Sequence, residues 1–186
     1  MGGPRRFGEC DCVFSFRAGA GHSRRGHSGV WVELMKRHPA LEDLSRDHQQ
    51  FLLHARGLRW ALEGNPHAQP LPVEVTRLME FWESAGASHF IEEESILVPT
   101  CEQATVDLAT FTRKLLRDHS WLRARIERLK EDLDPKAIAE YAQYLHDHIR
   151  FEERVIFEGL QTALSEAELQ ALGRRLQAAR TQRSAF

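Results

Sequence analysis

The sequence contains no apolar run that approaches the roughly 20 residues of a membrane-spanning helix. It has only three cysteines in 186 residues, at Cys10, Cys12 and Cys101. An odd and sparse set excludes a disulfide framework and fits a reducing compartment, so we expect a cytoplasmic protein. Cys10 and Cys12 by themselves are too few ligands for a structural zinc site, which needs four.

An excess of one charge is also missing. The 25 Lys and Arg residues nearly balance the 27 Asp and Glu residues, and the net charge is −2. Such a chain has no general attraction for nucleic acid or an anionic membrane, so we expect neither as a partner. The alternating pattern of β-strands is absent too. Histidine, in contrast, is abundant, with ten residues.

The first 34 residues differ from the rest of the chain. They are rich in Gly, Arg and Ser and show no sustained apolar period. They also lack the apolar core and the cleavage site of a secretory signal. We therefore expect a disordered extension over residues 1–34 and a folded domain over residues 35–186. Alternatively, the natural protein begins at Met35, where the patterned sequence starts.

Four later segments carry apolar residues at helical spacing. The first begins at Pro39 and stops at Gly64, the second is ended or bent by Pro99, and the fourth starts with the N-cap Asp134. Ser165 opens a short fifth helix with a capping box. The expected apolar seams include Leu44, Leu52 and Leu62 in the first helix, Leu115, Leu122 and Leu133 in the third, and Leu145 and Val155 in the fourth. The pattern predicts an all-α, antiparallel up-down four-helix bundle with a C-terminal helix.

Each of these four seams also contains a histidine, and two contain a glutamate one turn after it. Residues four apart lie on the same face of a helix, so these side chains should meet at the bundle axis. Buried carboxylates are costly without a cationic partner. Histidine with carboxylate suits iron, manganese or zinc. We therefore predict six metal ligands: His48, His89, Glu93, His119, His148 and Glu152.

An internal repeat supports this prediction. The triplet RDH occurs at 46–48 and 117–119, and HFIEEESIL (89–97) aligns with HIRFEERVI (148–156). The chain thus reads as two copies of one helical hairpin, each supplying two histidines and one glutamate. We expect two metal ions, each with two histidines, bridged by Glu93 and Glu152.

From residue 38 to about 160, the pair of His-x-x-x-Glu motifs, each preceded by a seam histidine, resembles the hemerythrin-like HHE cation-binding family. The resemblance implies a non-haem di-iron centre, two Fe ions with Mn or Zn as alternatives, and oxygen, peroxide or nitric oxide as the small ligand. It also implies a ligand set: His48 and His89 on one iron, His119 and His148 on the other, and Glu93 and Glu152 between them.

The resemblance fails at one position. Oxygen-carrying hemerythrins have two histidines one turn apart on the third helix, whereas the residue four after His119 is Arg123. A cation would then stand where a ligand should be. This favours reactivity or sensing over reversible oxygen carriage. Tyr144, one turn before His148, either approaches the site or is a core tyrosine.

Other acidic residues flank the six. Asp47, Asp118 and Asp147 each precede a ligand histidine and could orient metal-bound imidazoles. Neighbouring residues on a helix point about 100° apart, so we expect a solvated face instead. We likewise expect Glu92, Glu94 and Glu153 to be solvated or capping, with Glu94 as an extra ligand the alternative.

Three classes of function fit these patterns. The first is a di-iron module that binds or senses a small ligand or iron. The second is an oxidase or peroxide-consuming enzyme, and the third is a structural bundle with zinc or no metal. The six polar residues in the seams argue against the third.

Overall fold

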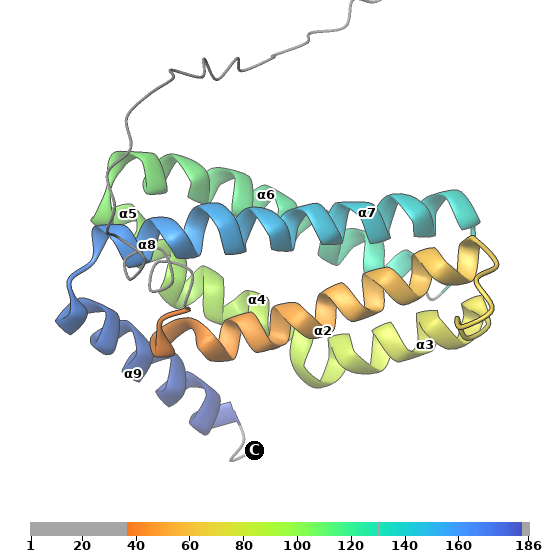
Figure 1. Ribbon diagram of the computed structural model, residues 1–186, viewed down its shortest axis with the longest axis horizontal. Helices are drawn as coiled ribbons and strands as arrows, with labels where there is room; N and C mark the ends of the chain where they lie inside the picture. The colour runs from red at the N-terminus through yellow and green to blue at the C-terminus, as the bar shows by residue number, and fades with distance from the viewer. Residues whose placement is uncertain (1–36, 130, 184–186) are drawn as a thin grey trace, which may run out of the picture. The chain divides into compact units, whose positions relative to one another are not determined.

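The computed structural model describes residues 37–129 and 131–183. The predicted extension over residues 1–34, with Cys10 and Cys12, lies outside the described residues. Every regular element in the described part is helical, as Figure 1 shows. Within those residues, no helix is both long and apolar enough to cross a membrane.

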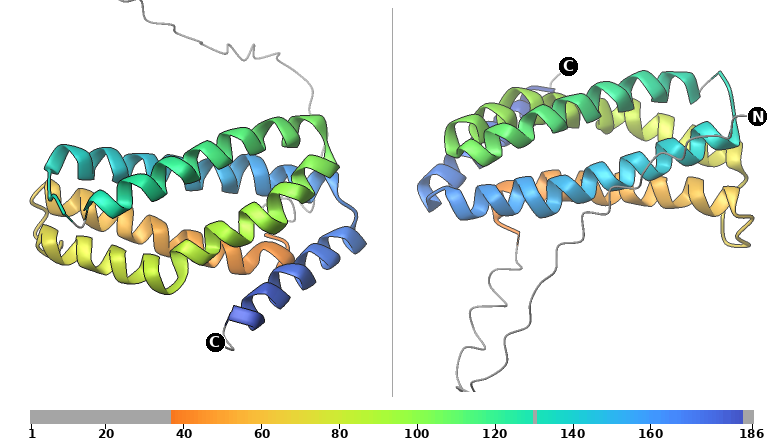
Figure 2. Two further views of the ribbon diagram at one scale, coloured as in Figure 1. Left: turned by 180° about the vertical axis from the view of Figure 1, so that it is seen from behind. Right: turned by 90° about the horizontal axis from the view of Figure 1, so that it is seen from above.

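Four helical rods form an antiparallel bundle, which confirms the predicted fold class (Figures 1 and 2). The first rod is α2 (Pro39–Leu62), and the third is α6 (Val106–Leu129). The second rod comprises α3 (Leu71–Phe81), η1 (Trp82–Gly86), α4 (Ala87–Glu92), η2 (Glu93–Leu97) and α5 (Val98–Ala104). The fourth comprises α7 (Pro135–Phe151), η3 (Glu152–Ile156) and α8 (Phe157–Ala163), and a fifth helix, α9 (Glu166–Arg183), follows.

Three residues that were expected to begin or end helices do so in the structure. Asp134 caps α7 by accepting hydrogen bonds from the backbone N–H groups of Lys136 and Ala137. Gly64, just beyond α2, has a φ of 67°, a left-handed conformation that favours glycine. Ser165 and Glu168 form the predicted capping box, with the Ser165 N–H donating to Glu168 over 2.8 Å.

Pro99 does not end the second rod, which continues to Ala104. Proline inside a helix removes one N–H donor and clashes with the carbonyl four residues earlier. Here the preceding turn, η2, is a π-helical turn in which the Val98 N–H donates to the Glu93 carbonyl. This wider turn makes room for the proline ring. Only Thr105, in an extended conformation, separates α5 from α6.

A matching π-helical turn, η3, begins at Glu152, where the Phe157 N–H donates to the Glu152 carbonyl. The wider turn adds one residue and shifts the apolar face after it. Ile156 and Phe157 are therefore fully buried, whereas Val155, expected in the seam, is only partly buried. Of the three π-helical turns in the described residues, η2 and η3 begin at the seam glutamates and η1 begins at Trp82. Such turns are frequent at functional sites.

The apolar core consists of two clusters at opposite ends of the bundle. One is built around Phe51, Leu78, Phe90, Leu122 and Leu145, and the other around Leu44, Leu97, Leu115, Phe157 and Leu172. The seam prediction is wrong for Leu133, which is exposed. Leu52 and Leu62 are partly buried and pack against the cluster built around Phe51. The fully buried positions at this end of α2 are Phe51, Ala55 and Leu58.

Candidate metal centre

The six predicted ligands lie between the two apolar clusters. His48 follows Leu44 of one cluster and precedes Phe51 of the other, and the remaining rods place their polar residues in the same layer. All six side chains are at most 1% exposed. The structure thus brings together every predicted site residue: His48, His89, Glu93, His119, His148 and Glu152.

One half of this layer comes from the first two rods. The Nε2 atom of His89 lies 3.2 Å from Oε1 of Glu93, its partner one turn later. The Nε2 atom of His48 lies 3.4 Å from the same oxygen and 3.2 Å from Oε2 of Glu152. Two imidazole nitrogens and one oxygen from each glutamate therefore converge here. We call this group the first pocket.

The other half, the second pocket, comes from the last two rods. The Nε2 atom of His148 lies 3.3 Å from Oε1 of Glu152. The Nε2 atom of His119 lies 3.5 Å from that oxygen and 3.3 Å from Oε2 of Glu93. Each glutamate therefore presents one oxygen to each pocket.

None of these inward-facing atoms is satisfied within the protein. The four Nε2 atoms and the four carboxylate oxygens are buried without a hydrogen-bond partner. His48, His89, Glu93 and Glu152 form one group whose ligand atoms lie within 4.8 Å of one another, and His119, His148 and Glu152 form a second; each group could hold an ion. Orphaned polar atoms in a core are costly, and a cation among them removes the cost. The donor set therefore fits bound metal.

A comparison with protein families gives an independent result. Residues 39–160 match the Hemerythrin HHE cation binding domain. The chain belongs to this family. Comparisons with curated proteins and with solved structures found no match. The resemblance noted in the sequence is thus confirmed, and the HHE domain occupies the four rods of the bundle.

Two aspartates of this HHE domain lie behind the histidines, which corrects the expectation of a solvated face. Oδ2 of Asp47 accepts from Nδ1 of His89 over 3.2 Å, and Oδ2 of Asp118 accepts from Nδ1 of His148 over 3.4 Å. Each aspartate does point away from its own neighbouring histidine. It points instead to the histidine of the next rod.

Two glutamates complete the set, which corrects the expectation that they are solvated or capping. Oε1 of Glu153 accepts from Nδ1 of His48 over 2.7 Å, and Oε1 of Glu94 accepts from Nδ1 of His119 over 2.8 Å. All four rings thus donate Nδ1–H outward, which turns the Nε2 lone pairs inward. The internal repeat was the signal for these residues, because both the RDH and the Glu-Glu motifs recur in it.

The carboxylates that accept from the Nδ1 atoms of the four histidines, here called the outer carboxylates, have lowered pKa values. Burial alone would raise the pKa of Glu94, but contacts with His119 and Arg123 lower it to about 2. Burial would likewise raise the pKa of Glu153, which its contact with His48 lowers to about 2. For Asp118, burial is outweighed by His148 and nearby donors, and the pKa is again lowered to about 2.

In the metal-free chain, the inner histidines and glutamates shift one another's pKa values. Burial and the nearby Glu93 would raise the pKa of Glu152, but His148, His119 and His48 lower it to about 2. Burial would lower the pKa of His48 and of His119, but the surrounding glutamates raise both well above the usual value. The glutamates therefore favour the charged form of these two rings, and the rings favour the charged form of Glu152.

Arg123 does not stand where a ligand should be. Its guanidinium donates to Oε1 of Glu94 over 2.6 Å, on the Nδ1 side of His119 and away from the Nε2 atoms. Tyr144 likewise contacts a carboxylate behind a histidine and not the Nε2 atoms, because its hydroxyl donates to Asp118 over 2.8 Å. Both residues therefore act on carboxylates that hold histidines.

Aromatic rings shape the surroundings of the centre. Phe90 stacks on His119 with 3.8 Å between ring centroids, and Phe157 stacks on His48 at 5.1 Å. Phe51 meets His89 edge to face. These rings hold the imidazoles in place and keep the layer dry, which strengthens electrostatic interactions within it.

Proposed function

We propose that this HHE domain holds two iron ions and binds or senses a small ligand through them. His48 and His89 would bind one ion, His119 and His148 the other, and Glu93 and Glu152 would bridge both. The observation that carries this proposal is the set of eight buried, partnerless donor atoms arranged in two pockets. A cation in each pocket would satisfy these atoms.

The chemistry of the donors supports iron. Imidazole and carboxylate suit iron, manganese and zinc, whereas the soft thiolates preferred by copper(I) are absent from the layer. Each pocket offers two nitrogens and two oxygens, fewer than the six donors of an octahedral ion. A bound iron pair would supply a change of oxidation state and open positions for oxygen, peroxide or nitric oxide.

Burial supports a small ligand over an organic substrate. All six inner side chains are at most 1% exposed, and phenylalanines cover the rings. The polar neighbours Tyr144 and Arg123 bind outer carboxylates and so offer no convergent site for a larger molecule. A peroxide-consuming enzyme remains the alternative, and turnover of peroxide would distinguish it. The cysteine usage supports a cytoplasmic location.

The test is reconstitution with ferrous iron without oxygen, followed by elemental analysis and optical spectroscopy. We expect close to two iron ions per chain, and a new absorption band after addition of oxygen or nitric oxide. A chain that takes up no metal would overturn the proposal. Uptake of two ions with spectra that no small ligand changes would overturn the ligand assignment alone.

A further inference from the structure

Each of the four outer carboxylates is itself paired with a cation, but the cations come from different parts of the chain. In the second pocket, Arg123 donates to Glu94 over 2.6 Å, and Lys114 pairs with Asp118. Both cations belong to α6, a rod of the bundle that also carries His119. The second pocket is therefore supported from inside the bundle.

The first pocket depends on residues outside the four rods. Arg180, near the end of α9, donates to Oδ2 of Asp47 over 2.5 Å, and this same oxygen accepts from Nδ1 of His89. Arg37, which precedes α2, lies 2.5 Å from Oε2 of Glu153. The family match spans residues 39–160, so it includes neither arginine.

Arg180 links two elements at once. Its Nε donates to Oε2 of Glu92 over 2.9 Å, while its other end holds Asp47. Glu92 lies in α4, the helix that carries His89, and Asp47 lies in α2. The guanidinium therefore bridges the two rods that build the first pocket. A planar fork of donors suits this double role better than a lysine ammonium does.

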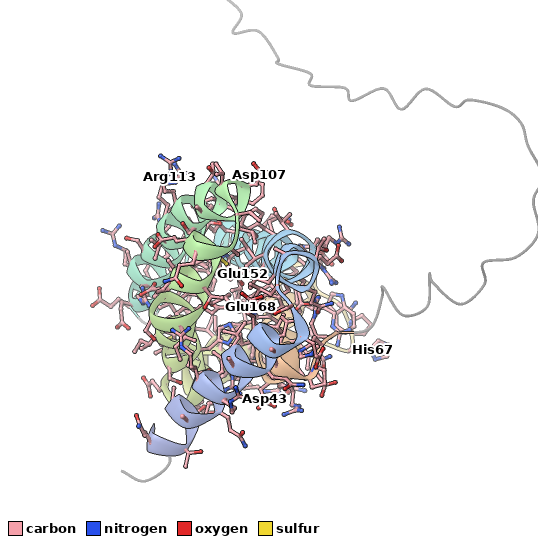
Figure 3. The ribbon with its side chains drawn as sticks, turned by 90° about the vertical axis from the view of Figure 1, so that its left-hand side faces the viewer. Asp43, His67, Asp107, Arg113, Glu152 and Glu168 are labelled. Carbon is pink, nitrogen blue, oxygen red and sulfur yellow. The ribbon has the colours of Figure 1, made fainter. Side chains whose placement is uncertain are left out.

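The packing of α9 explains how Arg180 reaches this position. Leu169, Leu172 and Leu176 of α9 are buried, and the latter two belong to the core cluster that contains Leu44. Gly173 lies so close to α2 that an added Cβ would be 3.0 Å from the Cβ of Ala40. Figure 3 looks along the bundle from this end and shows α9 crossing it beside Asp43 of α2.

We propose that α9 is a clamp for the first pocket: Arg180 fixes Asp47, Asp47 fixes the ring of His89, and release of α9 selectively loosens the ion held by His48 and His89. This inference rests on the proposed two-ion centre. Asp47 is partly exposed, with 21% of its side chain accessible. Without Arg180, the carboxylate of Asp47 can turn toward water. His89 then loses the hydrogen-bond acceptor that sets its tautomer and ring orientation.

The pockets should therefore differ in their dependence on the flanking segments. Arg180 and Arg37 are positioning residues for the first pocket, whereas Arg123 has the same task in the second. Any event that lifts α9, such as a partner binding its face, would open one pocket of the pair and leave its neighbour loaded.

The experiment uses the full chain loaded with zinc, a diamagnetic probe. Elemental analysis at buffered free zinc gives the number of ions, and nitrogen NMR of the imidazole rings shows which histidines bind through Nε2. In Arg180→Ala we expect the first-pocket affinity to fall 10- to 100-fold, with loss of the ligated signals of His48 and His89 first. Arg180→Lys should restore part of this affinity. Arg174→Ala, an exposed arginine of the same helix, should behave as wild type.

Two further variants guard against a merely structural effect. Gly173→Val should lift α9 from Ala40 and reproduce the selective loss, while Arg123→Ala should weaken the signals of His119 instead. Circular dichroism checks that each variant is folded. A wild-type chain without zinc would overturn the two-ion centre itself. A wild type with two ions, combined with equal loss from both pockets or no loss in Arg180→Ala, would overturn the clamp alone.

Discussion

Oε1 of Glu153 lies 2.7 Å from Nδ1 of His48, on the edge of the ring opposite to Nε2. The preceding residue, Glu152, faces that Nε2 atom at 3.2 Å. Two consecutive glutamates therefore approach opposite edges of one imidazole. Glu152 comes from the interior of the bundle, and Glu153 comes from the partly exposed side.

Removal of an inner glutamate should cost metal outright. In Glu93→Ala and in Glu152→Ala we expect at least one ion fewer per chain, because each carboxylate presents an oxygen to both pockets. Elemental analysis after ferrous reconstitution measures this loss. Glu158→Ala, at an exposed position of α8, is the control. Full occupancy in both inner variants would rule out bridging.

Removal of an outer glutamate should weaken binding without deleting a ligand. We expect Glu153→Ala to lower metal affinity about 10- to 100-fold, while saturating metal still gives two ions per chain, because the glutamate only orients His48. Competition with a chelator measures the affinity. A stoichiometry that stays near one at saturation would instead show that Glu153 is a ligand.

The chain offers a matched control for its outer aspartates. Asp47, Asp118 and Asp147 all precede a seam histidine, but Asp147 is 64% exposed and accepts from His146 instead of a ring of the centre. We expect Asp118→Asn to weaken metal binding about 10- to 100-fold and Asp147→Asn to leave it unchanged. Chelator competition compares the two. Equal effects would mean that the hydrogen bond to His148 does not orient the ring.

Metal binding should release protons. Burial would lower the pKa of His48 and of His119 in the metal-free chain, but nearby glutamates raise it, so both rings hold a proton more tightly than a free imidazole does, while the pKa of Glu152 is lowered to about 2. A metal ion must displace those ring protons. Affinity for zinc should therefore rise as the pH is raised from about 6 to 8. Calorimetry in buffers of different ionisation enthalpy counts the protons, and a count of zero would contradict the raised pKa values.

Arg123 should act only through Glu94. We expect Arg123→Ala to lower second-pocket affinity by less than Glu94→Ala does, and to have no further effect once Glu94 is replaced. The reason is that the guanidinium contacts Glu94 and lies away from the Nε2 atoms. A double-mutant cycle on metal affinity tests this. Additive effects would show a second route from Arg123 to the metal.

The sequence by itself determined the four rods and the inner layer. The apolar period of each rod is local, and residues four apart on a helix must share a face, so His89 with Glu93 and His148 with Glu152 could be placed without a structure. The Asp134 cap and the Ser165 capping box could be found for the same reason. The expectation for Leu133 failed because the end of a helix depends on competing local contacts and not on period alone.

Only the tertiary structure decided what surrounds that layer. Asp47 does point about 100° away from His48, as helix geometry requires, but the neighbouring rod places His89 in its path. The π-helical turns at Glu93 and Glu152 likewise leave no period in the sequence, and they shift the faces that follow them. Arg180 reaches Asp47 because α9 packs on α2, a contact between residues 133 positions apart. Contacts between rods depend on how helices pack against each other, and the periodicity of a single helix carries no information about its neighbour.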